Sequence, residues 1–443
     1  MKNILALVTF QHAEASFAPD ATDIRSAMLS GAIFDPAVRP NKTVLVVAGF
    51  SLLTINSVDN VQQSLTVTGW LTLTWTDYRL AWQPSSFGDI QEIHVMPSEI
   101  WKPEVIITNS LADIGVINDD NLQLTVTNTG DVLWEPPGLY TTHCEIDITY
   151  YPFDRQKCII ELTSWSMTKD QLELDLASDD IDTEDLRTNG EWIIVSTSVR
   201  DSDLLDTKPD GTVVTSSQLD FILVLERRPA FYAINFILPI ILSSFLSCVV
   251  FLVPIQAGEK VSYILTMILA IAVLLTMIAD SLPHTSLTAS VLGIYLAITM
   301  FLSVLCALIT VLLLTIFHNK EKVDTTSFFY KLTVVVATII SFNGCKRRCK
   351  KGNGNAENKV FPNGTLPSKN MKNEAAGDYE MDKQRIETLI SVDNGGKQVY
   401  TWAELANIWD RFCFWVFIAF TSLCTVSFLV ALAVGGRKDY VST

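Results

Sequence analysis

Four long stretches without a charged residue constrain the fold of this chain more than any other feature. A helix needs about 20 residues to cross a hydrocarbon layer roughly 30 Å thick, and each stretch has at least 19. Four fully buried helices of this length would overfill a soluble domain of this size. We therefore expect a polytopic membrane protein. The expected spans are Phe231–Val253, Val261–Ala279, Ser290–Phe317 and Phe412–Val434.

Charge divides the chain into two different parts. Residues 1–230 carry 34 acidic and 14 basic side chains, whereas the remaining residues carry 14 acidic and 18 basic ones. An acidic surface repels phosphate groups, so nucleic acid is not an expected partner of the first part. The five histidines show no metal-ligand spacing, and the chain has neither a Gly-rich phosphate loop nor a nucleophile motif. We therefore expect neither an enzyme nor a bound cofactor or metal.

The basic link between the third and fourth spans sets the expected orientation. Lys320, Lys322 and the run CKRRCKK at 345–351 predict that this link is cytoplasmic. The acidic part and both termini then lie outside the cell, with the spans in the plasma membrane. The start of the chain has a lysine, a short apolar run and a small-residue cleavage pattern, which predict a signal peptide. The expected segments are this peptide at 1–15, the exterior domain at 16–229, three spans at 230–317, a cytoplasmic loop at 318–408, the fourth span at 409–436 and a tail at 437–443.

The exterior part has the pattern of β-strands. Apolar and polar residues alternate in Ser64–Trp75, Leu122–Asn128 and Leu219–Glu226, with turn residues between such segments, which predicts a sandwich of antiparallel sheets. A short helix is expected near residues 20–29, and Asn41 begins an Asn-Lys-Thr glycosylation sequon.

The expected fold class is therefore an extracellular β-sandwich joined to a four-helix transmembrane bundle. The cytoplasmic loop should be partly helical and partly disordered. Its helical part is expected at Thr325–Phe342, lying at the membrane interface, with helical character returning from about Tyr379.

The second span carries polar side chains on one side. Several copies of the helix with this side inward would enclose water, where membrane proteins tolerate polar groups. The alternative is that the hydroxyl groups bond to neighbouring helices. The stripe has spacings of three and four residues, as one helix face requires. It consists of Ser262, Thr266, Leu269, Val273, Thr276 and Asp280.

Two cysteines lie in the exterior part, Cys144 and Cys158, and they can pair in an oxidising space. The 13 residues between them contain Tyr-Pro-Phe-Asp at 151–154. This loop resembles the signature loop of the Cys-loop, or pentameric ligand-gated, ion channels. The resemblance covers nearly the whole chain. It includes WLTLTWTD from Trp70, IWKPEV from Ile100, PPG from Pro136, SWS at Ser164, GEW at Gly190, ERRP before the first span, Pro239 within it and GEK before the second.

The family resemblance, strongest to the nicotinic acetylcholine and serotonin receptor branch, implies a cation channel of five subunits. A small-molecule agonist, here unidentified, would bind between exterior domains and open a central pore for cations. The expected partners are therefore an agonist, cations, membrane lipid and like subunits in a homo- or hetero-pentamer. The alternative is a non-conducting or modulatory subunit without an agonist site of its own.

The resemblance gives the stripe on the second span its roles. Glu259 would form a carboxylate ring at the cytoplasmic mouth and Asp280 a second ring at the outer mouth. The hydroxyl groups would contact partly dehydrated ions, and the two aliphatic positions of the stripe would close the pore by dewetting. Anion-selective relatives carry a Pro-Ala insertion before this helix, and residues 256–259 show none. Lys260 is expected to point away from the pore toward the cytosolic edge.

The resemblance also implies an agonist site between subunits. Trp165 matches the tryptophan of the principal face, and Trp70 matches that of the neighbouring face, to which Leu133 is also assigned. Two positions depart from the aromatic pattern, Thr108 after WKP and Met167 after SWS.

The segment DSDLLDTKPDGTVVTSSQ at 201–218 has neither aromatic residues nor the adjacent cysteines of acetylcholine-binding subunits. Acetylcholine is therefore not assigned as the agonist. The alternative for both site tryptophans, Trp70 and Trp165, is packing within the sandwich, which is the expected role of Trp75 and Trp101.

By the same resemblance, the exterior domain should be coupled to the pore by the loop tip Tyr151–Asp154, the turn near Asp59 and Asn60, Arg227 and the segment Ser281–Thr285. The coupling residues assigned within these segments are Phe153, Asp154, Arg227, Asp59 and Pro283. A direct interaction between Asp154 and Arg227 is expected. The alternative for Arg227 is a simple membrane-flanking charge.

Overall fold

The computed structural model describes most of the chain in two compact units. The described residues are 20–29, 34–112, 115–117, 121–207, 209–283, 289–319, 328–344 and 401–435. The first unit is Met1–Ala233, Met277–Leu292 and Ala431–Thr443, and the second is Ile234–Thr276 and Gly293–Val430. The predicted signal peptide, most of the predicted cytoplasmic loop and the predicted tail lie outside the described residues.

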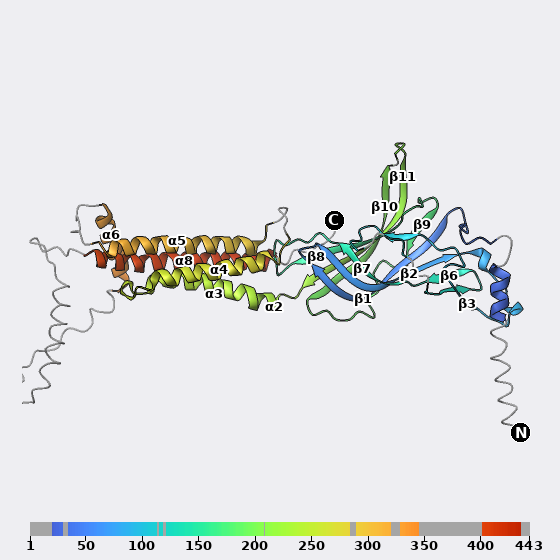
Figure 1. Ribbon diagram of the computed structural model, residues 1–443, viewed down its shortest axis with the longest axis horizontal. Coiled ribbons are helices and arrows are strands. Elements are labelled where there is room, and N and C mark those ends of the chain that lie inside the picture. The colour runs from blue at the N-terminus through green and yellow to red at the C-terminus, as the bar shows by residue number, and fades with distance from the viewer. Residues whose placement is uncertain are drawn as a thin grey trace, which may run out of the picture. The chain divides into compact units, whose positions relative to one another are not determined.

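The first unit contains two β-sheets, as the alternating sequence predicts (Figure 1). One sheet has seven strands in the order β3-β5-β6-β2-β1-β9, with β7 also paired to β2. Its strands are β1 Val44–Asp59, β2 Ser64–Thr76, β3 Glu92–Val95, β5 Leu124–Thr127, β6 Asp131–Trp134, β7 Pro137–His143 and β9 Leu172–Leu176. The other sheet has the order β10-β11-β8-β4. Its strands are β4 Val105–Ile107, β8 Arg155–Ser164, β10 Trp192–Thr207 and β11 Val213–Arg227. A helix at 20–29 precedes β1, as expected.

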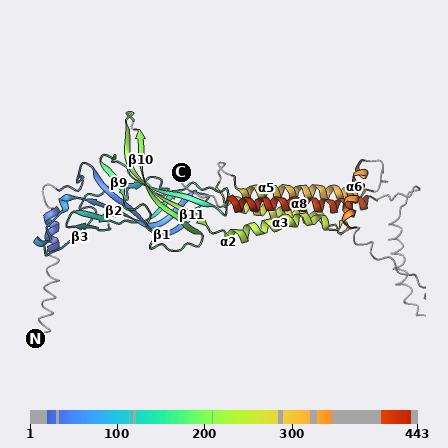
Figure 2. The same cartoon turned by 180° about the vertical axis from the view of Figure 1, so that it is seen from behind.

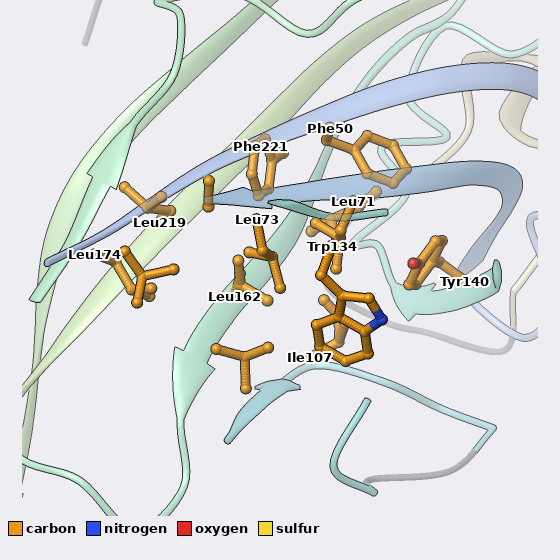
Figure 3. Close-up of a cluster of buried hydrophobic side chains, with 14 of the residues drawn as sticks. Phe50, Leu71, Leu73, Ile107, Trp134, Tyr140, Leu162, Leu174, Leu219 and Phe221 are labelled. Carbon is orange, nitrogen blue, oxygen red and sulfur yellow. The ribbon is translucent and has the colours of Figure 1, made fainter. Parts of the chain in front are cut away.

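The core of this unit lies between the two sheets. Every second side chain of β2 is buried from Leu65 to Trp75, because successive residues of a strand point to opposite faces. Figure 3 shows Leu71, Leu73 and Trp134 of the seven-stranded sheet meeting Leu162 and Phe221 of the other.

Two further tryptophans, Trp75 and Trp101, are buried and make an edge-to-face contact with their ring centroids 6.0 Å apart. The prediction that these two belong to the core is confirmed.

The disulfide between Cys144 and Cys158 is present, with the two Cα atoms 5.0 Å apart. Within the closed loop, the Gln156 side chain accepts a bond from the Asp147 N–H (2.9 Å) and donates to its carbonyl (3.0 Å). The loop is thus fixed by a covalent bond at its base and by a side chain across it.

Replacing Cys144 with alanine should lower the free energy of unfolding of the exterior unit by about 3 kcal/mol, the loop-entropy value for a ring of roughly 15 residues. Thermal unfolding of purified protein measures this change. Cys424→Ala, which removes a half-buried thiol from another part of the chain, is the control. Equal unfolding temperatures for the two variants would contradict the prediction.

Among the residues that the structure describes, four helices are long and apolar enough to cross a membrane: Ala230–Leu252, Lys260–Ala279 (α4), Val291–Phe317 (α5) and Trp402–Gly435 (α8). All four expected spans are found, and α8 begins before the expected boundary at residue 409. Within the second unit, these helices run side by side (Figures 1 and 2). A further helix, α6 (Phe328–Gly344), falls on the predicted interfacial segment, and the Trp409 Nε1 of α8 donates to the Thr333 Oγ1 of α6 (2.9 Å).

The first span is not a uniform α-helix. A short turn, α2 (Ala230–Tyr232), is followed by a π-helical segment at Ala233–Ile237, then by α3 (Leu238–Cys248) and a 3₁₀ turn at Val249–Leu252. Pro239 explains the π-helical segment just before it. Proline lacks an N–H, and in a regular α-helix its ring would clash with the carbonyl four residues earlier.

Polar side chains join the spans inside the second unit. The Tyr295 hydroxyl lies 2.9 Å from the Thr425 Oγ1 and 3.3 Å from the Ser244 Oγ, and the Ser303 Oγ lies 3.1 Å from the Ser247 Oγ. These bonds connect α3, α5 and α8 where no water competes, which is a common way of fixing helix contacts in membranes.

Candidate functional sites

Helix α4 has two distinct faces. The residues of its buried face are spaced three, four or seven positions apart, and they are Lys260, Ile264, Met267, Ile271 and Ile278. The predicted stripe lies two residues out of phase, a rotation of about 200° at 3.6 residues per turn. All of its residues are exposed in the single chain, as is Glu259. The stripe therefore points away from the helices of its own subunit.

The hydroxyl groups of the stripe bond within α4. The Thr266 Oγ1 donates to the Ser262 carbonyl, and the Thr276 Oγ1 donates to the Val273 carbonyl, each at 2.8 Å. These two hydroxyl groups therefore donate within their own helix and not to neighbouring helices, which was the alternative. Because each proton is used inside the helix, the oxygen lone pairs are what the stripe presents outward. Leu269, 64% exposed, adds a bare aliphatic surface between the two threonines.

Lys260 turns away from the stripe, as expected, and the structure adds a partner for it. This side chain is 1% exposed, and its Nζ lies 2.6 Å from the Asp410 Oδ1 of α8. A buried ammonium group needs a partner, since an unpaired charge in an apolar interior is costly. Sequence reasoning did not single out Asp410, although an acidic residue beside an otherwise apolar span was the available signal.

The predicted principal-face residues follow the ends of strands β4 and β8 of the four-stranded sheet. Trp165 directly follows β8 and is 72% exposed, so packing within the sandwich does not explain it. Met167, two residues later, is half-buried against the core. The Thr108 Oγ1 donates to the Glu161 Oε2 (2.9 Å), and the Ser166 hydroxyl bonds to the Glu104 carboxylate. The residue that follows the exposed indole is thus bonded to a carboxylate.

The predicted residues of the neighbouring face lie on the other sheet. Trp70 is half-buried and lies on the face of β2 that points away from the core, as do Thr72 and Thr74. Leu133 of β6 pairs with Thr74, so it shares this face with Trp70. The two sets of predicted ligand residues therefore belong to different sheets of one subunit.

The β10–β11 hairpin is fastened to the segment that carries Trp165. The Lys169 N–H donates to the Thr215 carbonyl (2.8 Å), and the Lys169 Nζ donates to the Asp203 Oδ1 (2.6 Å). The hydrogen bond to Asp203 raises the pKa of Lys169 above its ordinary value. This ion pair is exposed, so we assign it little stability.

Arg227 lies at the centre of a buried polar cluster and is 2% exposed. Its Nε and Nη2 donate to the two carboxylate oxygens of Asp154 at 2.9 and 3.2 Å. Its Nη1 donates to the Glu191 Oε1 (2.6 Å), and its Nη2 also donates to the Asn60 Oδ1 (2.8 Å). The expected interaction between Asp154 and Arg227 is present, and a membrane-flanking charge does not describe this residue.

Three aromatic rings surround the same guanidinium. Its central carbon lies 4.2 Å from the Trp192 ring centroid, 5.1 Å from that of Tyr151 and 5.4 Å from that of Tyr232. Rings at these distances attract a cation. Burial alone would lower the pKa of Arg227, but the nearby carboxylates raise it above its ordinary value, so the cation persists in this interior.

The set of coupling residues predicted from the sequence is incomplete. It omitted Glu191, Trp192 and Tyr232, which contact Arg227 or its partners. The GEW motif at 190–192 was a signal for the first two. The position of Tyr232 beside Arg227 becomes visible in the fold.

The remaining predicted coupling residues make no hydrogen bond or ion pair with Arg227 in the described part of the chain. The Asp59 Oδ1 accepts from the N–H groups of Val61 and Gln62 at 2.8 and 2.9 Å, which shapes the β1–β2 turn. Phe153 is half-buried in the disulfide loop, and Pro283 is buried.

Two bonds connect the sandwich to residues 277–292, which belong to the same compact unit. The Asn60 Nδ2 donates to the Ser281 carbonyl (3.4 Å), just past the end of α4. The Val291 N–H, at the start of α5, donates to the Thr149 carbonyl of the disulfide loop (2.9 Å). Segments on both sides of the link between α4 and α5 are therefore bound to the sandwich.

Comparison with known proteins gives matches to two family models. Residues 21–229 match the neurotransmitter-gated ion-channel ligand binding domain, and residues 236–399 match the neurotransmitter-gated ion-channel transmembrane region.

Similar curated proteins are subunits of neuronal acetylcholine receptors. The chain is 34% identical to the beta-2 subunit of Carassius auratus over 65% of its own length and 61% of that subunit. It is 32% identical to the human alpha-3 subunit over 68% of its own length and 58% of that subunit. The matches thus span about three fifths of the relatives' length.

Proposed function

The chain belongs to the neurotransmitter-gated ion-channel family, and from this premise we propose that it is a subunit of a ligand-gated, cation-selective channel. This is a family of channels and not of enzymes. The single observation that carries the proposal is the exposed stripe of α4, whose polar residues face away from the described helices of their own subunit. In five such helices arranged around an axis, the polar stripes would face a water-filled space and not lipid.

The stripe accounts for cation selectivity. Glu259 and Asp280, at opposite ends of α4, are both exposed. Five carboxylates about 8 Å from a cation contribute on the order of 2–3 kcal/mol in water by Coulomb's law. Between the two rings, Ser262, Thr266 and Thr276 line the path, and the outward lone pairs of the two threonines favour a cation over an anion.

Leu269 and Val273 form the proposed gate. Both are aliphatic, exposed and adjacent on the stripe, so five copies would make a short apolar constriction. Such a constriction blocks ions by dewetting when it is narrow.

The proposed agonist site combines faces of two subunits. Trp165, with Thr108 and Met167, would supply the principal face, and Trp70 with Leu133 the neighbour's face. These sets lie on different sheets of one chain, which supports a site between subunits of a pentamer. The agonist is an unidentified small molecule.

The Arg227 cluster is the proposed coupling element. Asp154, Phe153 and Asp59 would act with Arg227 and Pro283 to transmit movement of the sandwich to the pore. Strand β11 supports this role, because it runs without interruption from the hairpin beside the ligand face to Arg227.

A second candidate is a non-conducting or modulatory subunit of a hetero-oligomer. The observation in its favour is the loss of aromatic side chains at Thr108 and Met167, which leaves Trp165 as the aromatic residue of the predicted principal set. In either case we propose a multi-pass protein of the plasma membrane with both termini outside. Asn41, exposed just before β1, would then carry a glycan.

Neutralising the inner carboxylate tests the main proposal. Glu259→Gln should shift the reversal potential toward that of chloride in dilution experiments, because it removes the inner charge ring. The Leu269→Thr background described below supplies agonist-independent current. Glu173→Gln, an exposed acidic residue on β9, is the control and should leave the reversal potential unchanged. Unchanged selectivity in Glu259→Gln, with no labelling of cysteines placed along the stripe, would overturn the proposed pore.

A further inference from the structure

We propose that a hollow on the exterior unit is the docking site for the first sugar of a glycan attached to Asn41. The inference rests on the proposed exterior position of this unit and goes beyond the channel function. The hollow has a volume of about 340 Å³ and lies over the face of β1, β2 and β6 that points away from the core. Its lining includes Asn41, Leu45, Thr74, Thr76 and Asp131.

The attachment point is held in place beside the hollow. The Arg39 Nη1 donates to the Gln171 carbonyl (3.1 Å), and the Thr43 Oγ1 donates to the Asp170 carbonyl (2.7 Å). These two bonds tie the chain on both sides of Asn41 to the segment just before β9. A glycan on the exposed Asn41 side chain therefore leaves the protein from a fixed point that itself lines the hollow.

The hollow has the size of a small-molecule site. Such sites have volumes of roughly 300–1,000 Å³, so this one has room for the N-acetylglucosamine that begins an N-linked glycan. Because the sugar is tethered to Asn41, docking is intramolecular and takes place at a high effective concentration. A few ordinary contacts are then enough to hold the sugar.

The chemistry of the hollow matches the two sides of a sugar ring, which has C–H faces and a hydroxyl edge. Leu45 is 50% exposed and offers an aliphatic surface to a C–H face. The Asp131 carboxylate accepts from the hydroxyl groups of Thr76 and Thr129, at 2.7 Å each and one on each oxygen. Each oxygen keeps a further lone pair, which can accept a charge-assisted bond from a sugar hydroxyl.

Release of the glycan from native protein tests the docking. The full chain is solubilised in mild detergent and treated with a peptide N-glycosidase, with denatured protein as the reference for complete release. Cleavage follows the population of the undocked glycan. Leu45→Lys places an ammonium group in the hollow near Asp131 and displaces the sugar, so we expect it to speed native release about tenfold.

Val38→Lys is the matched control for this experiment. Val38 is also an exposed aliphatic residue, 54% exposed and close to Asn41 in the chain, but it is not part of the lining of the hollow. It gains the same charge as Leu45→Lys and should release the glycan at the rate of the parent.

A double-mutant cycle connects the glycan to the hollow. Asn41→Gln removes the glycan and keeps a side-chain amide. In the glycosylated parent, Leu45→Lys should lower the unfolding temperature by about 2–4 °C, the shift that one ordinary contact makes in a domain of this size. In Asn41→Gln the same substitution should have a much smaller effect, because the contact is already lost.

The outcomes separate this inference from the proposed channel. No current is measured, so failure of the proposed pore leaves the docking site unaffected. If denatured protein shows no glycan that Asn41→Gln abolishes, the exterior glycan and its docking are overturned together. Equal native release from Leu45→Lys and Val38→Lys overturns the docking alone. So does a loss of pentamer in Leu45→Lys that is the same with and without Asn41→Gln, because a neighbouring subunit would then fill the hollow.

Discussion

Replacing Leu269 with threonine should produce a standing cation current without any agonist. The side chain is 64% exposed on the stripe of α4, and in five copies it would form the apolar constriction proposed as the gate. A threonine of similar width brings a hydroxyl that water can wet, so the dewetted closed state loses its barrier. Whole-cell current in the absence of ligand, with sodium replaced by a large impermeant cation, measures the effect.

Leu265→Thr is the control for this experiment. Leu265 is also an exposed leucine of α4, 57% exposed, but it lies outside the stripe. We expect a leak at least tenfold larger from the Leu269 variant at equal surface expression. Similar currents from both variants would show that general loosening of the helix, and not the stripe, is responsible.

Removing one partner of the buried pair between Lys260 and Asp410 should prevent accumulation of folded subunit. Asp410→Ala leaves an ammonium group that is 1% exposed without its carboxylate, and breaking a buried pair in this way costs roughly 3–5 kcal/mol. That is a large part of the stability of a typical domain. Surface biotinylation and the thermal stability of detergent-solubilised protein measure the loss.

The double variant Lys260→Met with Asp410→Leu shows whether the loss comes from an unpaired buried charge or from altered side-chain packing. Replacing both members of a buried pair by apolar residues is often neutral or stabilising, so the double variant should recover folded protein. Arg411→Ala removes an exposed charge beside Asp410 and should change stability by less than about 0.5 kcal/mol. If the double variant were as unstable as Asp410→Ala, the pair would not be the reason for the loss.

The sequence predicts the fold well because its periodicities are strong. Uncharged stretches mark the four spans, and alternation marks β2 and β11, since burial on one face imposes it on a strand. The uncharged stretch that marks the fourth span begins after the polar first turns of α8, such as the one at Trp402–Leu405, because hydropathy reports only the apolar part of a helix. The expectation of helical character from about Tyr379 agrees with a helix that starts before the span.

The candidate sites were predictable where residues share one element, or where the family resemblance pairs two of them, as it does Asp154 and Arg227. The stripe of α4 depends on helical spacing alone, so its phase could be read directly, and its exposure agrees. The surroundings of Arg227 come from separate segments, with Asn60, Asp154 and Glu191 far apart in the chain. Lys260 shows the same limit, because its partner is 150 positions away.

The bond between Lys260 and Asp410 lies wholly within one polypeptide. Each copy of α4 is therefore secured to α8 of its own chain by this pair. In a ring of mixed composition, one copy can be exchanged for a different relative without breaking this pair in the rest. Which chains assemble together would then depend on the surfaces that separate copies present to each other, so α4 and the choice of partners could diverge independently in evolution.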